Sequence, residues 1–184
     1  MADIRTKRTD RAVKDALLKL LETKSLANIG MTELAQEAGV SRSTLYTHYG
    51  NVIEVFQALV VEFSEEIRSL NTQLKCDSCR VSGAKRPFCM ALRAAGPYQP
   101  LVLAPEFLHT YLEIVFNGPY LSTALEPYLA TGVSEQQARA LFTFQMTGCY
   151  TAATTMDDVL WEENQQAIDQ FIRGGMSALR SKGL

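Results

Sequence analysis

The chain has 184 residues, of which 47% are hydrophobic and 21% are charged. This composition excludes a disordered chain, and the length suits one ordinary domain or a small domain joined to a larger one. No apolar run approaches the ~18 residues that a membrane-spanning helix needs, and the first residues lack the apolar core of a secretory signal, so we expect a cytoplasmic protein.

The net charge of -2 hides an asymmetry along the chain. Residues 1–50 hold eight Lys or Arg and six Asp or Glu, a net of +2, whereas residues 51–184 hold ten and fourteen, a net of -4. A basic beginning followed by an acidic remainder favours contact with an anionic polymer at one end of the molecule.

The hydrophobic pattern predicts helices from the beginning of the chain. Apolar residues recur on one face over about residues 9–24, and shorter helical patterns cover about 31–38 and 42–49. A longer helix is predicted next, with Asn51 as its N-cap and a 3.6-residue period that extends to Leu74. The following stretch, "KCDSCRVSGAKRP", has no period and is expected to form a long loop.

Helical segments are also predicted after this loop, in "FCMALRAA", "PEFLHTYLEIVFN" and "PYLSTALEPYLA". Pro105 and Pro119 are expected in the first turns of two of them, where proline is tolerated. Ser134 and Gln137 predict a capping box at the start of a helix that runs to about residue 157, and a last helix is predicted over about 162–181. No convincing strand appears, so the fold class is predicted to be all-α.

The two short helices are joined by Ala38-Gly39-Val40-Ser41. Gly39 can adopt the left-handed conformation that ends a helix, and Ser41 can cap the next one. Val40 can pack inward and fix the angle between the helices. This pattern predicts a helix-turn-helix, a motif whose second helix enters the major groove of DNA.

Residues 42–49 contain few apolar side chains. Leu45, with help from Tyr49, is expected to hold this helix to the core. The other side chains carry hydroxyl, imidazole and guanidinium groups, which bind phosphate oxygens and base edges, and we expect them to face DNA. These predicted DNA-facing residues are Arg42, Ser43, Thr44, Tyr46, Thr47 and His48. On local chemistry alone, a solvated surface helix explains the same residues equally well.

The stretch "MTELAQEAGVSRSTLYTHYGNVIEVF" closely resembles the N-terminal DNA-binding region of the TetR/AcrR family of transcriptional regulators, and the resemblance covers residues 10–56. It implies a helix-turn-helix domain over residues 1–50, joined by a long helix to a helical effector-binding and dimerisation domain over 51–184. It implies a homodimer that binds a palindromic DNA operator and is released by a small-molecule effector, with repression as the commoner family mode. No cofactor is implied, and the absence of a phosphate-binding glycine motif or a nucleophile motif gives no reason to expect an enzyme.

The resemblance also predicts which residues contact DNA, and this chain departs from the family at four positions. Thr32, Glu33 and Tyr49 are expected near the DNA, and Arg5, Lys7 and Arg8 are expected to form a basic arm that reaches phosphates or a minor groove. The family usually has Ser or Thr at the position of Gly30, Phe at Tyr49, a phosphate-binding Lys at Val52 and an acidic residue at Ile53. The missing lysine predicts weaker or less salt-dependent DNA binding, although the N-terminus of the long helix can still offer backbone N–H groups to a phosphate.

Two further sites are predicted in the remainder of the chain. The effector pocket is expected among aromatic and methionine side chains, although such side chains at helical spacing more often form plain core: Phe63, Phe107, Tyr111, Phe142, Met146 and Tyr150. The family's dimer interface would use the last two long helices, where small residues permit close packing: Ala138, Gly148, Ala152 and Ala153.

The cysteines Cys76, Cys79 and Cys89 allow another interpretation. With His109 or Cys149 they could hold zinc, or they could form a redox pair whose thiol pKa values are lowered by Arg80, Lys85 and Arg86. Three unrelated cysteines remain the favoured reading, so no metal is expected. Two alternative functions stay open: a thiol- or metal-responsive regulator, and a helical dimeric binding protein that has lost DNA binding.

Overall fold

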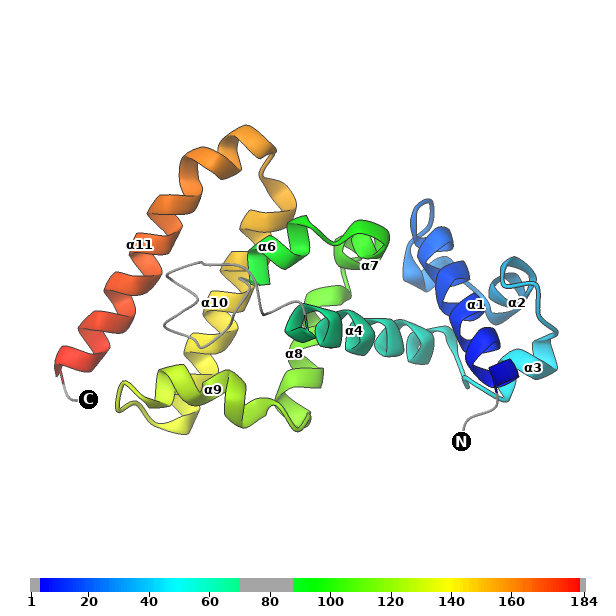
Figure 1. Cartoon of the computed structure of the whole chain (residues 1–184), viewed down its shortest axis with the longest axis horizontal. Helices are drawn as coiled ribbons and strands as arrows, with labels where there is room; N and C mark the ends of the chain where they lie inside the picture. Colours follow the sequence, from blue (N-terminus) through cyan, green and yellow to red (C-terminus); the bar gives the residue numbers. More distant parts are fainter. Residues whose placement is uncertain (1–3, 70–87, 183–184) are drawn as a thin grey trace. The chain divides into compact units, whose positions relative to one another are not determined.

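The computed structural model describes residues 4–69 and 88–182, and all regular structure within these ranges is helical, as the sequence predicts (Figure 1). The chain divides into two compact units. The first unit contains residues 1–63 and 96–110, and the second contains residues 64–95 and 111–184. None of the described helices combines the length and apolar character needed to cross a membrane.

The first unit begins with α1 (Ile4–Leu21), followed by a short 3-10 turn, η1 (Leu26–Asn28). Helix α1 starts five residues before the predicted position, so the proposed basic arm is helical, and Lys7 and Arg8 are exposed on its first turns. Val13 and Leu17 are completely buried on the opposite face, as the hydrophobic period predicts.

Helices α2 (Met31–Glu37) and α3 (Arg42–Tyr46) follow, and then α4 (Val52–Ser69). Helix α1 packs against α2, and α2 packs against α3. The apolar side chains of these helices form the core of the first unit, and the fully buried ones are Val13, Leu17, Leu34, Leu45, Val55, Phe56, Leu59 and Val60. This core is the platform on which α3 is held.

The first unit is completed by a segment from later in the chain, which contains η3 (Gly96–Tyr98), α7 (Gln99–Leu103) and the beginning of α8 (Phe107–Asn117). Helix α7 packs against α1. The ring centroid of Phe63 lies 5.3 Å from that of Tyr98 and 5.9 Å from that of Phe107. The sequence pattern did not predict α7, because its five residues are too few for a hydrophobic period and prolines surround it.

The second unit contains α6 (Phe88–Arg93), most of α8, α9 (Leu121–Leu129), α10 (Glu135–Thr155) and α11 (Asp158–Lys182). Helix α10 packs against α6, α9 and α11 (Figure 1). The predicted capping box is confirmed: the Ser134 hydroxyl accepts from the backbone N–H of Gln137 at 3.3 Å, and the Gln137 side chain accepts from the backbone N–H of Ser134 at 2.9 Å. The prediction that Pro105 and Pro119 lie in first helical turns is wrong, because each lies in the preceding turn, two residues before the first residue of α8 or α9.

The connection between α10 and α11 is held by Arg93 from α6. Its guanidinium donates to the carbonyl oxygen of Met156 at 2.8 Å, forms an ion pair with Asp158, and lies 5.1 Å from the centre of the Trp161 ring. The carbonyls at the C-terminus of a helix carry a partial negative charge, so a cation is favourable here. Trp161 is buried near the start of α11, where its contact with Arg93 helps to hold the helix.

Candidate DNA-binding site

The turn between α2 and α3 has the geometry that the sequence predicts. Gly39 has a φ of +65°, a left-handed conformation that residues with a side chain rarely adopt. The backbone N–H of Val40 donates to the carbonyl of Ala35 at 3.0 Å and closes the turn. The Ser41 hydroxyl accepts from the backbone N–H of Thr44 at 3.1 Å and caps α3. The helix-turn-helix geometry is therefore fixed by local bonds.

Helix α3 is shorter than predicted, because it ends at Tyr46, with Thr47 as its C-cap. Leu45 is fully buried and anchors the helix, as expected. The predicted DNA-facing side chains share the other side of the helix and its continuation: Arg42, Ser43, Tyr46 and Thr47 are exposed, and Thr44 and His48 are half-buried. The structure therefore gathers these residues on one accessible polar surface, the recognition face.

Hydroxyl groups on the recognition face are ordered by short-range bonds. The Ser41 hydroxyl lies 2.9 Å from that of Ser43 and 2.8 Å from that of Thr44, and the Thr47 hydroxyl donates to the Thr44 carbonyl at 2.6 Å. Within the described part of the chain, the side chains of Arg42 and Tyr46 make no hydrogen bond or ion pair. These two long side chains are therefore available for a partner.

Tyr49 differs from the other predicted contacts. Its hydroxyl donates a hydrogen bond to the carboxylate of Asp10 on α1, and burial together with this bond raises the pKa of Tyr49 above its usual range. The ring is half-buried, and its centroid lies 6.5 Å from that of His48. The hydroxyl of Tyr49 is thus used inside the protein, whereas its neighbour Thr47 is exposed.

Helix α2 contributes one exposed hydroxyl at its first turn, that of Thr32. Gly30 occupies the N-cap with no side chain to cap the helix, which is the weakness expected from this departure. Glu33, expected near the DNA backbone, forms an ion pair with Lys24, so its charge is balanced locally. Thr32 is the better placed of the two residues for a phosphate.

The N-terminus of α4 is capped by the chain itself. Asn51 accepts from the backbone N–H of Glu54 at 2.9 Å, which confirms the predicted N-cap. The Glu54 carboxylate accepts from the backbone N–H of Gly50 at 2.7 Å and from the Asn51 amide at 3.1 Å. A carboxylate therefore occupies a position at which a phosphate was expected to bind. Val52 is buried, and Ile53 is 57% exposed, so an apolar side chain stands beside this carboxylate.

The residues predicted to line an effector pocket are divided between the two units. Phe63 and Phe107 pack against each other in the first unit. In the second, Tyr111 stacks on Phe88 at 4.7 Å, and Phe142 lies 5.7 Å from Phe116, these distances being between ring centroids. Met146 is buried and Tyr150 is half-buried, and burial raises the pKa of Tyr150. These contacts are those of core residues.

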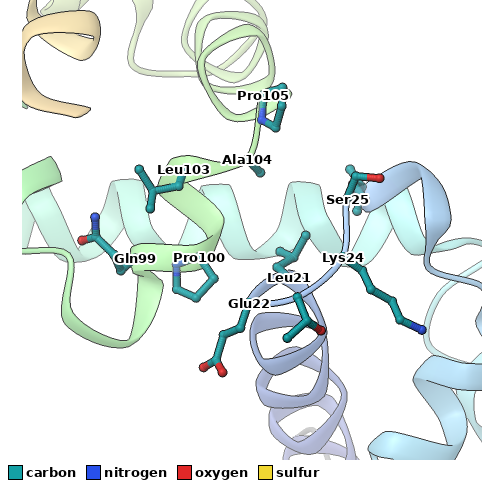
Figure 2. Close-up of a pocket in the computed structure, with 11 residues that line it drawn as sticks. Leu21, Glu22, Lys24, Ser25, Gln99, Pro100, Leu103, Ala104 and Pro105 are labelled. Atoms are coloured by element: carbon teal, nitrogen blue, oxygen red, sulfur yellow. The ribbon is translucent and has the colours of Figure 1, made fainter. Parts of the chain in front are cut away.

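A cavity of about 490 Å³ lies in the first unit, between the end of α1 and the α7 segment (Figure 2). Figure 2 shows the Lys24 ammonium directed away from it. The walls of the cavity come from two stretches that are far apart in the sequence. The first is Leu21, Glu22, Thr23, Lys24, Ser25 and Leu26, and the second is Gln99, Pro100, Leu103, Ala104 and Pro105. None of the six predicted effector-pocket residues lines it, and a sequence pattern that misses α7 cannot reveal it.

Of the three cysteines proposed to form a zinc or redox site, Cys76 and Cys79 lie outside the described residues. Cys89 on α6 is hydrogen-bonded to Cys149 on α10, and this bond together with burial raises the pKa of the Cys89 thiol. This direction is opposite to the lowered thiol pKa that the neighbouring basic residues predict. Across residues 4–69 and 88–182, no group of three or more His, Cys, Asp or Glu side chains could hold a metal ion, and His109 is exposed.

Residues 14–59 match the family model described as "Bacterial regulatory proteins, tetR family". The matched residues cover the last part of α1, all of α2 and α3, and the first part of α4, so they include the turn and the recognition face. No curated protein sequence matches the chain significantly.

Solved structures resemble the chain over nearly its whole length. The TetR family repressor AlkX from Dietzia sp. strain DQ12-45-1b, implicated in biodegradation of n-alkanes, is 21% identical, with 94% of this chain and 95% of that chain covered and a TM-score of 0.43. The fatty acid degradation regulator FadR from Bacillus halodurans is 14% identical, with 94% of each chain covered and a TM-score of 0.54.

A putative TetR-family transcriptional regulator from Mesorhizobium loti MAFF303099 is 19% identical, with 99% of this chain and 98% of that chain covered and a TM-score of 0.37. Of the three structures, FadR has the score that indicates a shared all-α fold. The family match falls on the helix-turn-helix and on the capped turn that orients α3. Residues 14–59 of the chain therefore carry the N-terminal region described for bacterial regulatory proteins of the tetR family.

Proposed function

We propose that the protein is a ligand-responsive repressor that binds a palindromic operator as a homodimer and is released by a small-molecule effector. The observation that carries this proposal is the recognition face: a short helix held by one fully buried side chain, Leu45, and presenting polar groups beyond a rigid turn. A surface helix with no partner would have no need of so constrained a turn. We propose the cytoplasm as the location in which the protein meets its operator.

The recognition face suits the major groove. Arg42 and Tyr46 are the long side chains available for base edges or phosphates, because neither is engaged within the described chain. Ser43, Thr44 and Thr47 supply hydroxyls. We assign His48 and Thr32 to the edges of the contact, since both are accessible at the ends of the motif.

The proposed homodimer rests on the surface of α10 and α11. Helix α11 has 25 residues, and among its described side chains Trp161 and Met176 are buried. Phe171 on α11 is 71% exposed and Phe144 on α10 is 69% exposed, together with other apolar side chains of α11. Exposed apolar surface marks an interaction site when it is contiguous, and we propose that these side chains form such a surface. Of the small residues predicted for this interface, Gly148 is exposed, whereas Ala138, Ala152 and Ala153 are buried within the chain.

We assign DNA binding to residues 1–50, and effector binding and dimerisation to residues 51–184. An effector held by Phe142, Met146 and Tyr150 would lower operator affinity if it bound the DNA-free conformation more tightly than the DNA-bound one. A two-fold dimer matches a palindromic site because each protomer then meets one half-site.

The test is a gel shift on the DNA upstream of the protein's own gene, and on sequences selected from random DNA, at two salt concentrations. Changing both Thr44 and Tyr46 to Ala should weaken operator binding by roughly 10-fold or more, because base contacts are worth about 1–3 kcal/mol each. Tyr120→Ala provides a control, since Tyr120 is 42% exposed on the second unit and Tyr46 is 49% exposed.

Full operator affinity in the double variant would refute the recognition face. Failure of the wild-type protein to bind any DNA at low salt would instead support the helical binding protein without DNA binding, for which the Glu54 carboxylate at the start of α4 gives a physical reason. Release of the operator by an oxidant or a chelator would support the thiol- or metal-responsive regulator.

A further inference from the structure

A chain of polar side chains crosses the first unit from the end of the recognition face to η3. The Tyr49 hydroxyl donates to Asp10, whose second carboxylate oxygen lies 2.9 Å from the Lys14 ammonium. Lys14 lies 2.9 Å from one carboxylate oxygen of Glu62, and the Tyr98 hydroxyl donates to the other at 2.5 Å. We call these five residues (Tyr49, Asp10, Lys14, Glu62 and Tyr98) the polar relay.

The charges of the relay alternate, and each carboxylate oxygen has at least one donor. A phenol stands at each end as a donor, and the ammonium of Lys14 stands between the carboxylates of Asp10 and Glu62. Arg11 adds a second cation, 2.9 Å from the Glu62 oxygen that Tyr98 also contacts. A polar network in which every acceptor has a donor fixes the geometry of its members.

The relay is partly shielded from water, which strengthens its hydrogen bonds and ion pairs. The Lys14 side chain is 13% exposed, and that of Glu62 is 31% exposed. Burial, with the hydrogen bond to Glu62, raises the pKa of Tyr98 to about 12, so its hydroxyl stays protonated and can only donate to the carboxylate. The same holds for Tyr49, whose pKa is raised by burial and by Asp10.

Helix α3 depends on attachments of this kind because it buries few side chains itself. It contains five residues, and Leu45 is its one fully buried side chain. The capped turn fixes the beginning of α3 and Leu45 anchors its middle, so the end of the helix is the part that gains from a further attachment. The Tyr49 backbone N–H donates to the Leu45 carbonyl at 3.0 Å, so the hydroxyl bond from Tyr49 to Asp10 gives the recognition face a second attachment to α1.

We propose that Tyr98 and Glu62 are positioning residues for the DNA-binding face, which they orient through Lys14, Asp10 and Tyr49. This inference rests on the proposed function, in which α3 reads DNA. Tyr98 lies in residues 96–110, far along the chain from α3, so a segment outside the proposed DNA contacts contributes to operator affinity.

The test compares Tyr49→Phe, Tyr98→Phe and the double variant of the full-length protein, each of which loses only hydroxyls. Operator dissociation constants and thermal midpoints are measured for all three. Each single variant should bind the operator about 3- to 10-fold more weakly, the range expected for one internal hydrogen bond. The double variant should lose no more operator affinity than the single variant that binds more weakly, because both substitutions break the same relay.

Tyr128→Phe is the matched control, because the Tyr128 hydroxyl donates to Gln145 at 2.7 Å within the second unit. It removes an internal tyrosine bond of the same kind and should leave operator affinity within about twofold of wild type. If Tyr98→Phe fails to fold, Glu62→Gln, which keeps the shape of the side chain and removes its charge, should show the same loss of affinity.

Two results would overturn the positioning role while leaving the proposed function intact: wild-type affinity in a folded Tyr98→Phe protein, or losses that multiply in the double variant. A wild-type protein that binds no specific DNA would refute the proposed function, and the positioning role with it.

Discussion

Gly39 shows how a single residue determines the geometry of the recognition face. Its φ of +65° ends α2, and the chain then turns into the Ser41 cap of α3. A side chain at Gly39 would meet no atom within 4 Å, so the need for glycine is conformational and not a matter of space. Sequence alone predicts this requirement, because a glycine followed by a hydroxyl cap is a strong local signal.

Gly39→Ala should therefore lower the free energy of unfolding by about 1–2 kcal/mol, the cost of a left-handed residue with a side chain. Gly148→Ala on α10 is the control: it also meets open space, but it lies inside a helix, where alanine is favoured by about 1 kcal/mol. Urea denaturation should show opposite signs for the two variants. Equal effects would mean that the turn relaxes around the new side chain.

Glu62 makes the stability of the first unit depend on pH. Burial pushes its pKa upward, but hydrogen bonds from Tyr98 and Lys14 and the charges of Lys14 and Arg11 outweigh burial, so its pKa is lowered. A lowered pKa in the folded state stabilises the protein above the unfolded value of ~4.3, and this contribution disappears as the pH falls.

Unfolding by urea between about pH 6 and pH 3 should therefore show a loss of stability in acid that is smaller in Glu62→Gln than in wild type. Glu163→Gln serves as the control, because Glu163 is exposed on α11. Parallel curves for wild type and Glu62→Gln would show that Glu62 has no such role.

At the scale of the elements, the sequence predicts those helices whose signals are local or periodic. The turn residues Gly39 and Ser41, the Asn51 cap and the Ser134 capping box are all found as expected. Helix α7 escapes prediction because a five-residue helix between prolines is stabilised by packing against α1, which no local pattern records. The bond from Tyr49 to Asp10 escapes for the same reason, since it joins residues 39 positions apart.

The N-terminus of α4 provides a test of DNA affinity. Ile53→Lys would place a cation at an exposed position beside the Glu54 carboxylate, close to where DNA phosphates are expected. Operator affinity should rise at low salt, and the salt dependence should steepen by about one unit of slope, as for one added phosphate contact. Val61→Lys, on the same helix at 38% exposure, adds an equal charge away from the N-terminus. Equal effects of the two variants would point to net charge as the cause.

At the scale of the whole molecule, the proposed dimer explains the apolar surface of α11. Phe171→Glu should convert the dimer to a monomer, because a buried unpaired carboxylate is costly, and should weaken operator binding by separating the half-site contacts. Leu103→Glu, at a 53% exposed position on α7, is the control for an added charge. Light scattering after size-exclusion chromatography distinguishes the two states. A dimeric Phe171→Glu protein would place the interface elsewhere.

The discontinuity of the first unit has a consequence for protein synthesis. The ribosome completes the helix-turn-helix early, but Tyr98, α7 and Phe107 are translated only after the first part of the second unit. A nascent or prematurely terminated chain that ends before residue 96 carries α3 yet lacks both the Tyr98 end of the relay and the packing of α7 on α1. The proposed positioning role therefore implies that operator affinity is acquired late in translation, and that incomplete products compete poorly with the finished protein for DNA.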